Sequence, residues 1–388
     1  MANVCTMYVQ DGIAPQWTTT EREVAMAQRD LIGHPDGERV VVLAATKDGL
    51  YHFTSDTERQ NWERSGPFFT GCDVSHASFD PRDGSLWAAA NNGDARVYRS
   101  ANLGGTWEAM GDPLPAELVW HVAPGRAEEP KTVFAGIMPA ALYRSDDGGT
   151  TWRPIEGLNG HETRGEWYGG GGGLCLHTII LAEKRPGRIY AGISCAGLFR
   201  SDDDGVTWYP VNEGVADFAE MAFPDGSVSH PGVHRCVHKA VVHPANPDVL
   251  FQQNHLGAYR SGDGGLTWQS INAGLPTDFG FPIAVGTGPQ PSIFVIPEDG
   301  NTIRTPGRLS VWRSNDEGAS WTESTAGLPE GETSVLREGM ATDNRDATGV
   351  YFGTRDGVLF ASTDGGDTWQ TLADDLPGVR SVKVAYAG

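Results

Sequence analysis

The chain has 388 residues, of which 50 are acidic and 29 basic, so its formal net charge is −21 at pH 7. This charge argues against nucleic acid and anionic membranes as partners, because both bind surfaces that are dense in lysine and arginine. The 51 glycines, 24 prolines and 12 tryptophans are typical of a turn-rich all-β protein with large aromatic anchors. No apolar run has the length needed to cross a bilayer.

The N-terminal segment and the cysteines bear on the compartment. Residues 1–12 lack a basic region followed by an apolar core, so no secretory signal is expected. The five cysteines are odd in number and spread from Cys5 to Cys236, which does not predict a disulfide framework. A reducing, cytoplasmic location is therefore expected.

Residues 1–36 precede the repeated part of the chain, and we expect them to form an extension that packs on the main domain. A capping threonine and early glutamates favour a short helix over residues 19–31. Residues 37–388 are expected to form one domain.

An eight-residue motif, Ser-x-Asp-x-Gly-x-Thr-Trp, organises this domain and reads SDDGGTTW at 145–152. The other copies lie at 100–107, 201–208, 261–268, 314–321 and 362–369, with a degenerate copy at 55–62. Successive tryptophans are 45 to 60 residues apart, which leaves room for four short strands per unit. The chain is therefore predicted to be an all-β, seven-bladed β-propeller.

Three residue types of the motif have a clear structural role. The aspartate can accept backbone N–H groups within the turn, the glycine supplies a positive φ, and the tryptophan can wedge between adjacent sheets. The first unit lacks an inner strand, while residues 379–385 form a spare strand after the last motif. We expect this C-terminal strand to complete blade one and close the ring.

Three segments lengthen the repeat, and all three map to the face opposite the motif turns. They are 153–174 between blades three and four, 209–235 between blades four and five, and 297–309 within blade six. Function in a propeller usually lies in loops, because packing fixes the blades. We therefore expect these segments to cover one sector of the mouth of a central channel.

Histidines gather in the same sector, with seven of the eleven between residues 161 and 255. His177 and His238 occupy equivalent positions at the start of two inner strands, and His255 lies in a turn on the same face. Three converging imidazoles would suit a divalent transition metal ion or an acid/base pair. They could equally be hydrogen-bonded residues that line a wet channel.

The predicted site is a small-molecule site of hydrolase or lyase type, with or without a metal. The candidate acid/base residues are His177, His238, Glu162 and Asp217. The candidate metal ligands are His177, His238 and His255. The candidate substrate contacts are Arg164, Arg304, Arg337, Trp167 and Tyr168. A non-catalytic scaffold that binds a ligand or a protein partner remains open, since no complete catalytic motif is present.

The motif resembles the Asp-box, or BNR repeat, of sialidases, of the sortilin luminal domain, of xyloglucan-type glycoside hydrolases and of the photosystem II assembly propeller. Residues 236–265, 274–285 and 349–362 also resemble a bacterial family of BNR/YVTN-like propellers that is often labelled sialidase-like. The Arg-Ile-Pro motif of sialidases does not occur in this chain, so sialidase activity is not expected. Xyloglucanase-type enzymes use a cleft between two such propellers, whereas this chain has the length for one.

Overall fold

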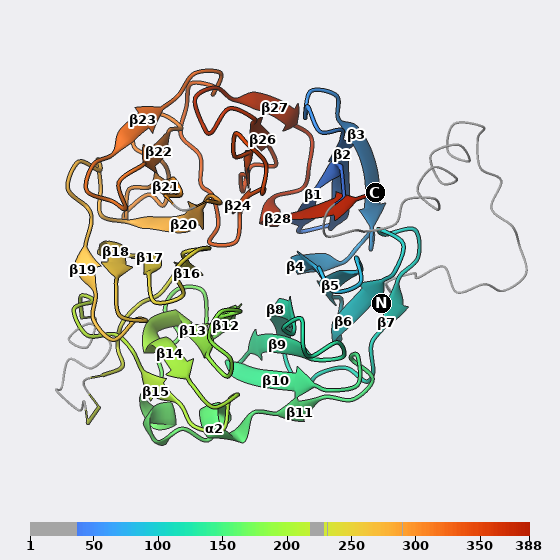
Figure 1. Cartoon of the computed structure of the whole chain (residues 1–388), viewed down its shortest axis with the longest axis vertical. Helices are drawn as coiled ribbons and strands as arrows, with labels where there is room; N and C mark the ends of the chain where they lie inside the picture. Colours follow the sequence, from blue (N-terminus) through green and yellow to red (C-terminus); the bar gives the residue numbers. More distant parts are fainter. Residues whose placement is uncertain (1–36, 218–228, 231, 289) are drawn as a thin grey trace, which may run out of the picture.

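The computed structural model describes residues 37–217, 229–230, 232–288 and 290–388. These residues form seven four-stranded antiparallel sheets, which are arranged as a ring (Figure 1). The predicted seven-bladed β-propeller is therefore confirmed. The predicted N-terminal extension, with its helix, lies outside the described residues.

Blade one combines the C-terminal strand with the first three strands of the chain, and blades two and three follow in chain order. From the axis outward, blade one contains β28 (Val379–Ala387), β1 (Arg39–Thr46), β2 (Gly49–Ser55) and β3 (Glu63–Phe68). Blade two contains β4 (Asp73–Phe79), β5 (Leu86–Asn91), β6 (Ala95–Ser100) and β7 (Glu108–Ala109). Blade three contains β8 (Leu118–Pro124), β9 (Val133–Met138), β10 (Ala141–Ser145) and β11 (Arg153–Pro154).

The other four blades follow in chain order. Blade four contains β12 (Leu176–Leu181), β13 (Ile189–Ile193), β14 (Gly197–Ser201) and β15 (Tyr209–Pro210). Blade five contains β16 (Lys239–Val242), β17 (Leu250–Asn254), β18 (Gly257–Ser261) and β19 (Gln269–Ser270). Blade six contains β20 (Gly280–Val285), β21 (Ile293–Pro297), β22 (Val311–Ser314) and β23 (Thr322–Ser324). Blade seven contains β24 (Met340–Thr342), β25 (Val350–Gly353), β26 (Leu359–Ser362) and β27 (Gln370–Ala373).

The strand sequences follow from their place in a blade. Neighbouring blades cover both faces of the second strand, so β13 reads IYAGI and is buried throughout. The outermost strand β7 reads Glu-Ala and is exposed at both residues. Within the described residues, three short helical segments interrupt the blades: α2 (Glu156–Asn159), η1 (Glu162–Glu166) and η2 (Ser194–Ala196). No helix of the described residues combines the length and the apolar character that a membrane-crossing helix needs.

The motif turns have the predicted internal bonds. Ser145 Oγ donates to Asp147 Oδ1 at 2.8 Å, and the Thr151 N–H donates to the same carboxylate oxygen at 2.9 Å. Gly149 has φ +87°, and its N–H donates to Ser145 Oγ at 2.8 Å. The serine–aspartate bond recurs at Ser201–Asp203, Ser261–Asp263, Ser314–Asp316 and Ser362–Asp364.

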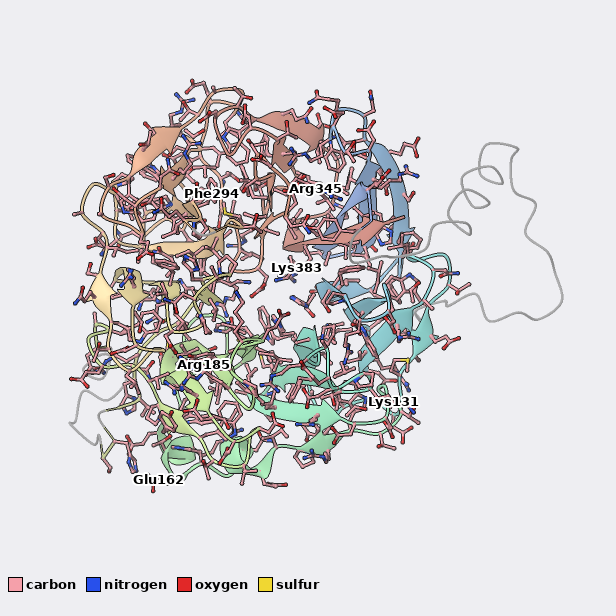
Figure 2. The ribbon with its side chains drawn as sticks, viewed as in Figure 1. Lys131, Glu162, Arg185, Phe294, Arg345 and Lys383 are labelled. Carbon is pink, nitrogen blue, oxygen red and sulfur yellow. The ribbon has the colours of Figure 1, made fainter. Side chains whose placement is uncertain are left out.

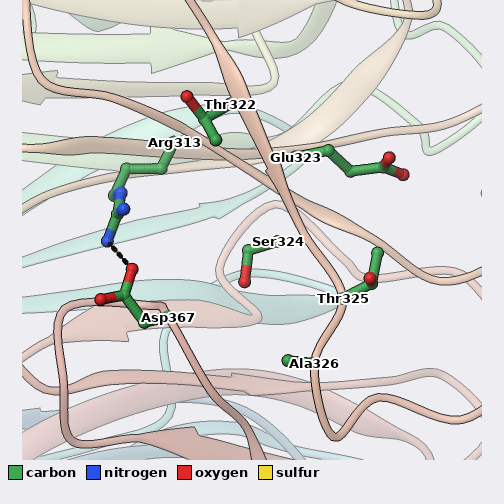
Figure 3. Close-up of a pocket in the computed structure, with 7 residues that line it drawn as sticks. All are labelled: Arg313, Thr322, Glu323, Ser324, Thr325, Ala326 and Asp367. Atoms are coloured by element: carbon green, nitrogen blue, oxygen red, sulfur yellow. Dashed lines mark ion pairs between the residues drawn. The ribbon is translucent and has the colours of Figure 1, made fainter.

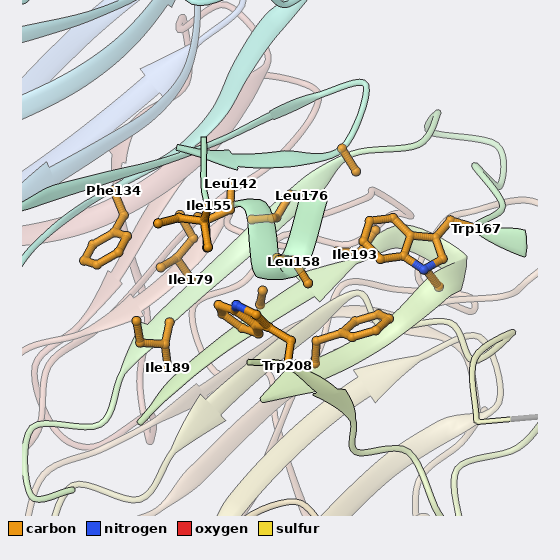
Figure 4. Packing of buried hydrophobic residues seen from close by; sticks show 14 of the residues in the cluster. Phe134, Leu142, Ile155, Leu158, Trp167, Leu176, Ile179, Ile189, Ile193 and Trp208 are labelled. Atoms are coloured by element: carbon orange, nitrogen blue, oxygen red, sulfur yellow. The ribbon is translucent and has the colours of Figure 1, made fainter. Parts of the chain in front are cut away.

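The motif tryptophans join neighbouring blades, as predicted. Trp268 of blade five donates from Nε1 to the carbonyl of Val211, which follows blade four, at 2.9 Å. Trp321 makes the equivalent bond to Ile271 at 2.8 Å. Figure 4 shows one of the hydrophobic clusters, in which side chains of blade three pack against those of blade four. The core of the protein is thus a series of layers between blades.

The C-terminal strand closes the ring. β28 pairs antiparallel with β1 from Arg39 opposite Ala387 to Thr46 opposite Val379. The strand begins where the sequence predicted and runs two residues further. Closure removes the free edge that blade one would otherwise expose.

The cysteines differ in part from expectation. Cys72 is disulfide-bonded, whereas Cys175, Cys195 and Cys236 are free and buried. The expectation that no cysteine forms a disulfide was therefore wrong for Cys72. The cytoplasmic location of the protein stays a prediction.

Candidate functional site

Glu338, two residues before β24, is the centre of a polar cluster on the axis of the ring. Its Oε2 accepts hydrogen bonds from Lys239 and from Lys383, the latter at 2.6 Å. His76 Nε2 lies 3.8 Å from Oε2, and His121 Nδ1 lies 4.0 Å from Oε1. The five residues of this Glu338 cluster come from blades one, two, three, five and seven.

Hydrogen bonds fix the orientation of the two imidazoles in the Glu338 cluster. The Val122 N–H donates to His76 Nδ1 at 3.4 Å, so the ring proton of neutral His76 lies on Nε2, facing Glu338. His121 Nδ1 donates to the carbonyl of His177 at 3.0 Å. The two rings stack with their centroids 4.0 Å apart. Both imidazoles are thus held rigidly beside the carboxylate.

The charges of the Glu338 cluster do not cancel. Glu338 and Lys239 are only 2% and 6% exposed. With both lysines protonated and both histidines neutral, the two ammonium groups and one carboxylate sum to +1. Burial opposes ionisation of Glu338, but the ammonium groups of Lys239 and Lys383 hold its pKa well below the usual range. Burial lowers the pKa of Lys239 to about 7, Glu338 opposes this shift and Lys383 adds to it, so the excess charge of +1 is present below about pH 7.

Burial also keeps the histidines neutral. It lowers the pKa of His76 to about 4, against the opposing effect of Glu338. It lowers the pKa of His177 well below the usual range, and the nearby Arg337 adds to this shift. Within the described part of the chain, His76 Nε2, His177 Nε2 and Glu338 Oε1 are buried and have no hydrogen-bond partner. Such atoms are costly unless water, an ion or a ligand satisfies them.

A second polar group lies where blade four meets blade five. Cys236, His238 and His255 each offer a ligand atom, and these atoms lie within 4.8 Å of one another. His255 Nδ1 is 3.0 Å from Cys236 Sγ, and the rings of His238 and His255 are 4.4 Å apart. Cys195 on η2 donates to Cys236 Sγ at 3.6 Å. The structure thus brings together two of the three predicted metal ligands, while His177 lies outside this group.

Arg337 lies near both polar groups. Its Nη1 donates to Cys175 Sγ at 3.5 Å, and its guanidinium stacks on the ring of Trp120 at 5.4 Å. The same cation contributes to the lowered pKa of His177 and of His238, although burial is the larger cause. Arg337 thus lies beside His177 and His238. Its role in binding a substrate stays a prediction.

Two of the three predicted loops contact each other. Glu166, in the segment 153–174, accepts a hydrogen bond from His234 Nε2 at 2.9 Å. Its carboxylate also accepts the N–H groups of Ser229 and His230. The connections of blades three to four and four to five are thus pinned to one another, and Glu166 is a residue that the sequence reasoning did not select.

The two predicted acidic residues are not brought to the axis. Glu162 is exposed on η1 and lies at the outer edge of the molecule, whereas Lys383 lies at its centre (Figure 2). Asp217 is exposed and forms an ion pair with Arg235 at 2.6 Å. The predicted pairing of these carboxylates with His177 and His238 is not found among the described contacts. The axial carboxylate is Glu338 instead.

Of the two aromatic residues predicted to contact substrate, Trp167 is part of the core. Trp167 is buried, donates to Thr163 Oγ1 at 2.9 Å and packs against Phe199 with ring centroids 5.1 Å apart. Arg164 stacks on the Trp167 ring at 4.6 Å and donates to the carbonyl of Ala140. Tyr168 is 45% exposed. Trp167 therefore anchors the loop to blades three and four, and Tyr168 alone of the pair faces solvent.

Arg304 lies on the loop between β21 and β22, as predicted. It forms an ion pair with Asp356 at 3.3 Å and donates to the carbonyl of Glu332 at 3.1 Å. A separate hollow of about 220 Å³ lies between β23 and the motif turn of blade seven, beside the Arg313–Asp367 ion pair (Figure 3). Neither feature touches the Glu338 cluster.

Several residues of the two polar groups escaped the sequence reasoning. His76 and Lys383 lie on inner strands outside the histidine-rich stretch, and Lys239 directly follows a selected histidine. Their shared position on inner strands is the signal that could have identified them, because inner strands of different blades meet at the axis. Cys236 was likewise not selected as a site residue, although it contacts His255.

The BNR/Asp-box repeat model matches residues 143–154. The xyloglucanase Xgh74A of Acetivibrio thermocellus is 27% identical over 259 residues, which cover 60% of this chain and 28% of that enzyme. An ancestral GH74 enzyme has a TM-score of 0.57 at 19% identity, covering 78% of this chain and 38% of that one. YCF48 bound to D1 peptide has a TM-score of 0.52 at 14% identity, covering 92% and 99%.

Repeat, topology and structural likeness together define the class of protein. The chain is a seven-bladed β-propeller of BNR/Asp-box repeats. Within that class, the chain aligns with xyloglucanases but spans only about a quarter of the length of Xgh74A.

Proposed function

We propose that this propeller is an enzyme of hydrolase or lyase type whose substrate is a small molecule carrying a carboxylate. Its site is the Glu338 cluster, on the side of the ring that carries the segments 153–174, 209–235 and 297–309. The observation that carries this proposal is that Lys239 and Lys383 share a single buried carboxylate. While Lys239 is protonated, the uncompensated positive charge favours the binding of one further anion.

The surrounding groups fit such a substrate. Arg337 adds a cation, and Trp120 under its guanidinium offers the kind of aromatic face on which sugar rings pack. His76 Nε2 and His177 Nε2 are buried polar atoms with unused hydrogen-bonding capacity among the described residues. A bound carboxylate would neutralise the lysines, and its remaining polar groups would meet these imidazoles.

The chemistry at the axis differs from that of a two-carboxylate glycosidase. Such enzymes flank the scissile bond with two Asp or Glu residues. Among the described residues, Glu338 is the acidic group that pairs with Lys239, Lys383, His76 and His121. Proton transfer would therefore fall to a lysine or a histidine. Abstraction of a proton next to a neutralised carboxylate, or activation of water, is the chemistry that fits.

The experiment compares an acidic with a neutral oligosaccharide, since the aligned curated relatives are xyloglucanases. The full chain is incubated with trigalacturonate and with a neutral xyloglucan heptasaccharide. A lyase yields a double bond conjugated to the carboxylate, which absorbs ultraviolet light, whereas a hydrolase yields new reducing ends without that absorbance. Binding is measured in parallel by calorimetry. We expect trigalacturonate to bind and to be cleaved in preference to the neutral sugar.

A matched pair of variants assigns the binding to the Glu338 cluster. Lys383→Met removes one shared ammonium group and should weaken trigalacturonate binding about tenfold or more, equivalent to about 1.4 kcal/mol. Lys184→Met removes an exposed lysine whose ammonium group donates to the carbonyl of Ala245 at 3.4 Å, and it should bind as the parent does. Equal binding of both sugars, or equal binding by both variants, would contradict the proposal and favour the scaffold interpretation.

A further inference from the structure

We propose that Cys236, His238 and His255 form a binding site for a divalent transition metal ion of the zinc type. This site is separate from the Glu338 cluster and does not depend on the enzyme function proposed above. It retains two of the ligands that the sequence predicted and replaces His177 with a thiolate.

The backbone places the three ligands together for local reasons. Cys236 and His238 lie just before β16, and alternate residues of an extended segment point to the same side. His255 follows β17, the strand that pairs with β16, so it returns to the same end of the blade. The three ligand atoms lie within 4.8 Å of one another. One ion can therefore reach all three with small side-chain movements.

A hydrogen bond to Gly280 orients His238 for a metal. Its Nδ1 lies 2.6 Å from the carbonyl oxygen of Gly280, which can only accept a hydrogen bond. The ring proton is therefore on Nδ1, and Nε2 presents a lone pair. A metal-bound histidine usually donates its other N–H to a carbonyl or carboxylate in this manner. The bond to Gly280 thus orients His238 as a ligand before any ion arrives.

His255 Nδ1 and Cys236 Sγ lie within hydrogen-bond distance of one another. The two atoms are 3.0 Å apart, so the thiol of Cys236 bonds to the imidazole nitrogen. A divalent ion would replace the thiol proton: the S–H bond breaks, the proton leaves to solvent, and the metal–sulfur and metal–nitrogen bonds form. Nitrogen and sulfur ligands of this kind select zinc or a similar borderline ion over magnesium or calcium.

The neighbouring charges favour this site over the other histidine group. In the Glu338 cluster the carboxylate is already bound by two ammonium groups, which would repel a cation. The ligand atoms of the Cys236 group are one sulfur and two imidazole nitrogens, and no lysine belongs to that group. Neutral imidazole is the form that binds metal. Three protein ligands leave one tetrahedral position open, as in catalytic zinc sites.

The test uses Co²⁺ and Zn²⁺ alone as probes on the full chain, freed of metal by dialysis against chelator and kept reduced with a phosphine. We expect one equivalent of Co²⁺ per chain, displaced by Zn²⁺, with a thiolate-to-cobalt charge-transfer band in the near ultraviolet. Cys236→Ser should abolish that band and weaken metal binding by more than about 100-fold, since loss of an outer-shell partner alone costs 10–100-fold. His255→Asn, at a half-buried position after β17, should weaken binding to a similar extent.

Cys175→Ser is the matched control. Cys175 is also a free and buried cysteine of the same sector, but it does not belong to the ligand group. This variant should keep the stoichiometry and the band. The proposal is overturned if the parent binds no Co²⁺ in stoichiometric amount, or if the band survives in Cys236→Ser. It is also overturned if the reduced chain binds no metal and Cys195 and Cys236 only form a disulfide on oxidation. None of these readouts involves an oligosaccharide, so failure here is distinguishable from failure of the enzyme proposal.

Discussion

Lys383 and Glu338 form an ion pair across the seam where the ring closes, with Nζ and Oε2 2.6 Å apart. Lys383 lies on β28, which completes blade one, and Glu338 precedes β24 of blade seven. The backbone N–H of Val382 also donates to the carbonyl of Glu338 at 2.8 Å. The strand that closes the propeller is thus the strand that supplies a cation to the candidate site, so closure and site formation are coupled.

Glu338→Gln should destabilise the fold strongly. The substitution leaves Lys239 and Lys383 without a carboxylate in a buried setting, and breaking a buried pair in this manner typically costs about 3–5 kcal/mol. Urea unfolding at pH 7 measures the loss. Lys383→Met is the control, because Glu338 keeps its bond to Lys239 and the loss should be smaller. Equal stability of Glu338→Gln and the parent would show that the cluster is hydrated and contributes little.

Glu298 should make stability depend on pH. It is fully buried, and its carboxylate accepts the Val335 N–H at 2.8 Å and the Ser334 hydroxyl at 3.1 Å. Burial raises the pKa of Glu298 from 4.5 to about 7. The folded state therefore holds this proton more tightly than the unfolded state. Its contribution to stability is present at low pH and is lost as pH rises through about 4.5 to 7.

Glu298→Gln mimics the protonated form and tests this sign. The variant should be more stable than the parent at pH 8, by about 1–3 kcal/mol, and the difference should shrink toward pH 5. The free energy of unfolding of both proteins is measured at several pH values. A difference that does not change with pH would show that Glu298 is ionised equally well in both states.

Trp268→Ala tests whether the motif tryptophans hold adjacent blades together. The indole is buried between blades four and five and bonds to Val211. Large-to-small changes at such sites cost about 3–5 kcal/mol. Trp62→Ala, in the degenerate motif of blade one, should cost less, because Trp62 is only partly buried. Similar losses at the two positions, measured by thermal unfolding, would contradict this view.

The blades were predictable because the motif is local. Ser145 and Asp147 bond within one turn, and Trp152 bonds to Met110 of the preceding unit. A fixed spacing of such turns therefore gives the number and the order of blades. The closing strand was predictable for the same reason, since the first unit was one strand short.

The site was predictable only where residues lie on strands. His238 and His255 were placed together because strand pairing fixes their ends of the blade. The directions of Glu162 and Trp167 depend on how η1 folds and on which side chain enters the core, and spacing along the chain does not carry that information. His76 and Lys383 are 307 residues apart in the sequence, and their meeting depends on the closed ring.

Arg59 shows why the motif of blade one is degenerate. In SDTERQNW the arginine adopts φ +55° and reaches across the seam, and Nη1 lies 3.0 Å from Asp343 Oδ2 of blade seven. The side chains of both residues are almost fully buried. Asp343 also accepts the Tyr351 hydroxyl at 2.8 Å and the Gly349 N–H at 2.7 Å. The degenerate motif keeps a turn, in which the Arg59 N–H donates to Asp56 Oδ1 at 3.1 Å, and it adds a bond that closes the ring.

Arg59→Met should destabilise the protein by about 3–5 kcal/mol, because it leaves the Asp343 carboxylate buried without its cation. Asp343→Asn combined with Arg59→Met removes the stranded charge, so the double variant should lose less than the sum of the two single variants. The coupling energy from urea unfolding of the parent, both singles and the double should be about 0.5–3 kcal/mol. Strictly additive losses would show that the two residues stabilise the seam independently, through packing and through the bonds to Tyr351 and Gly349.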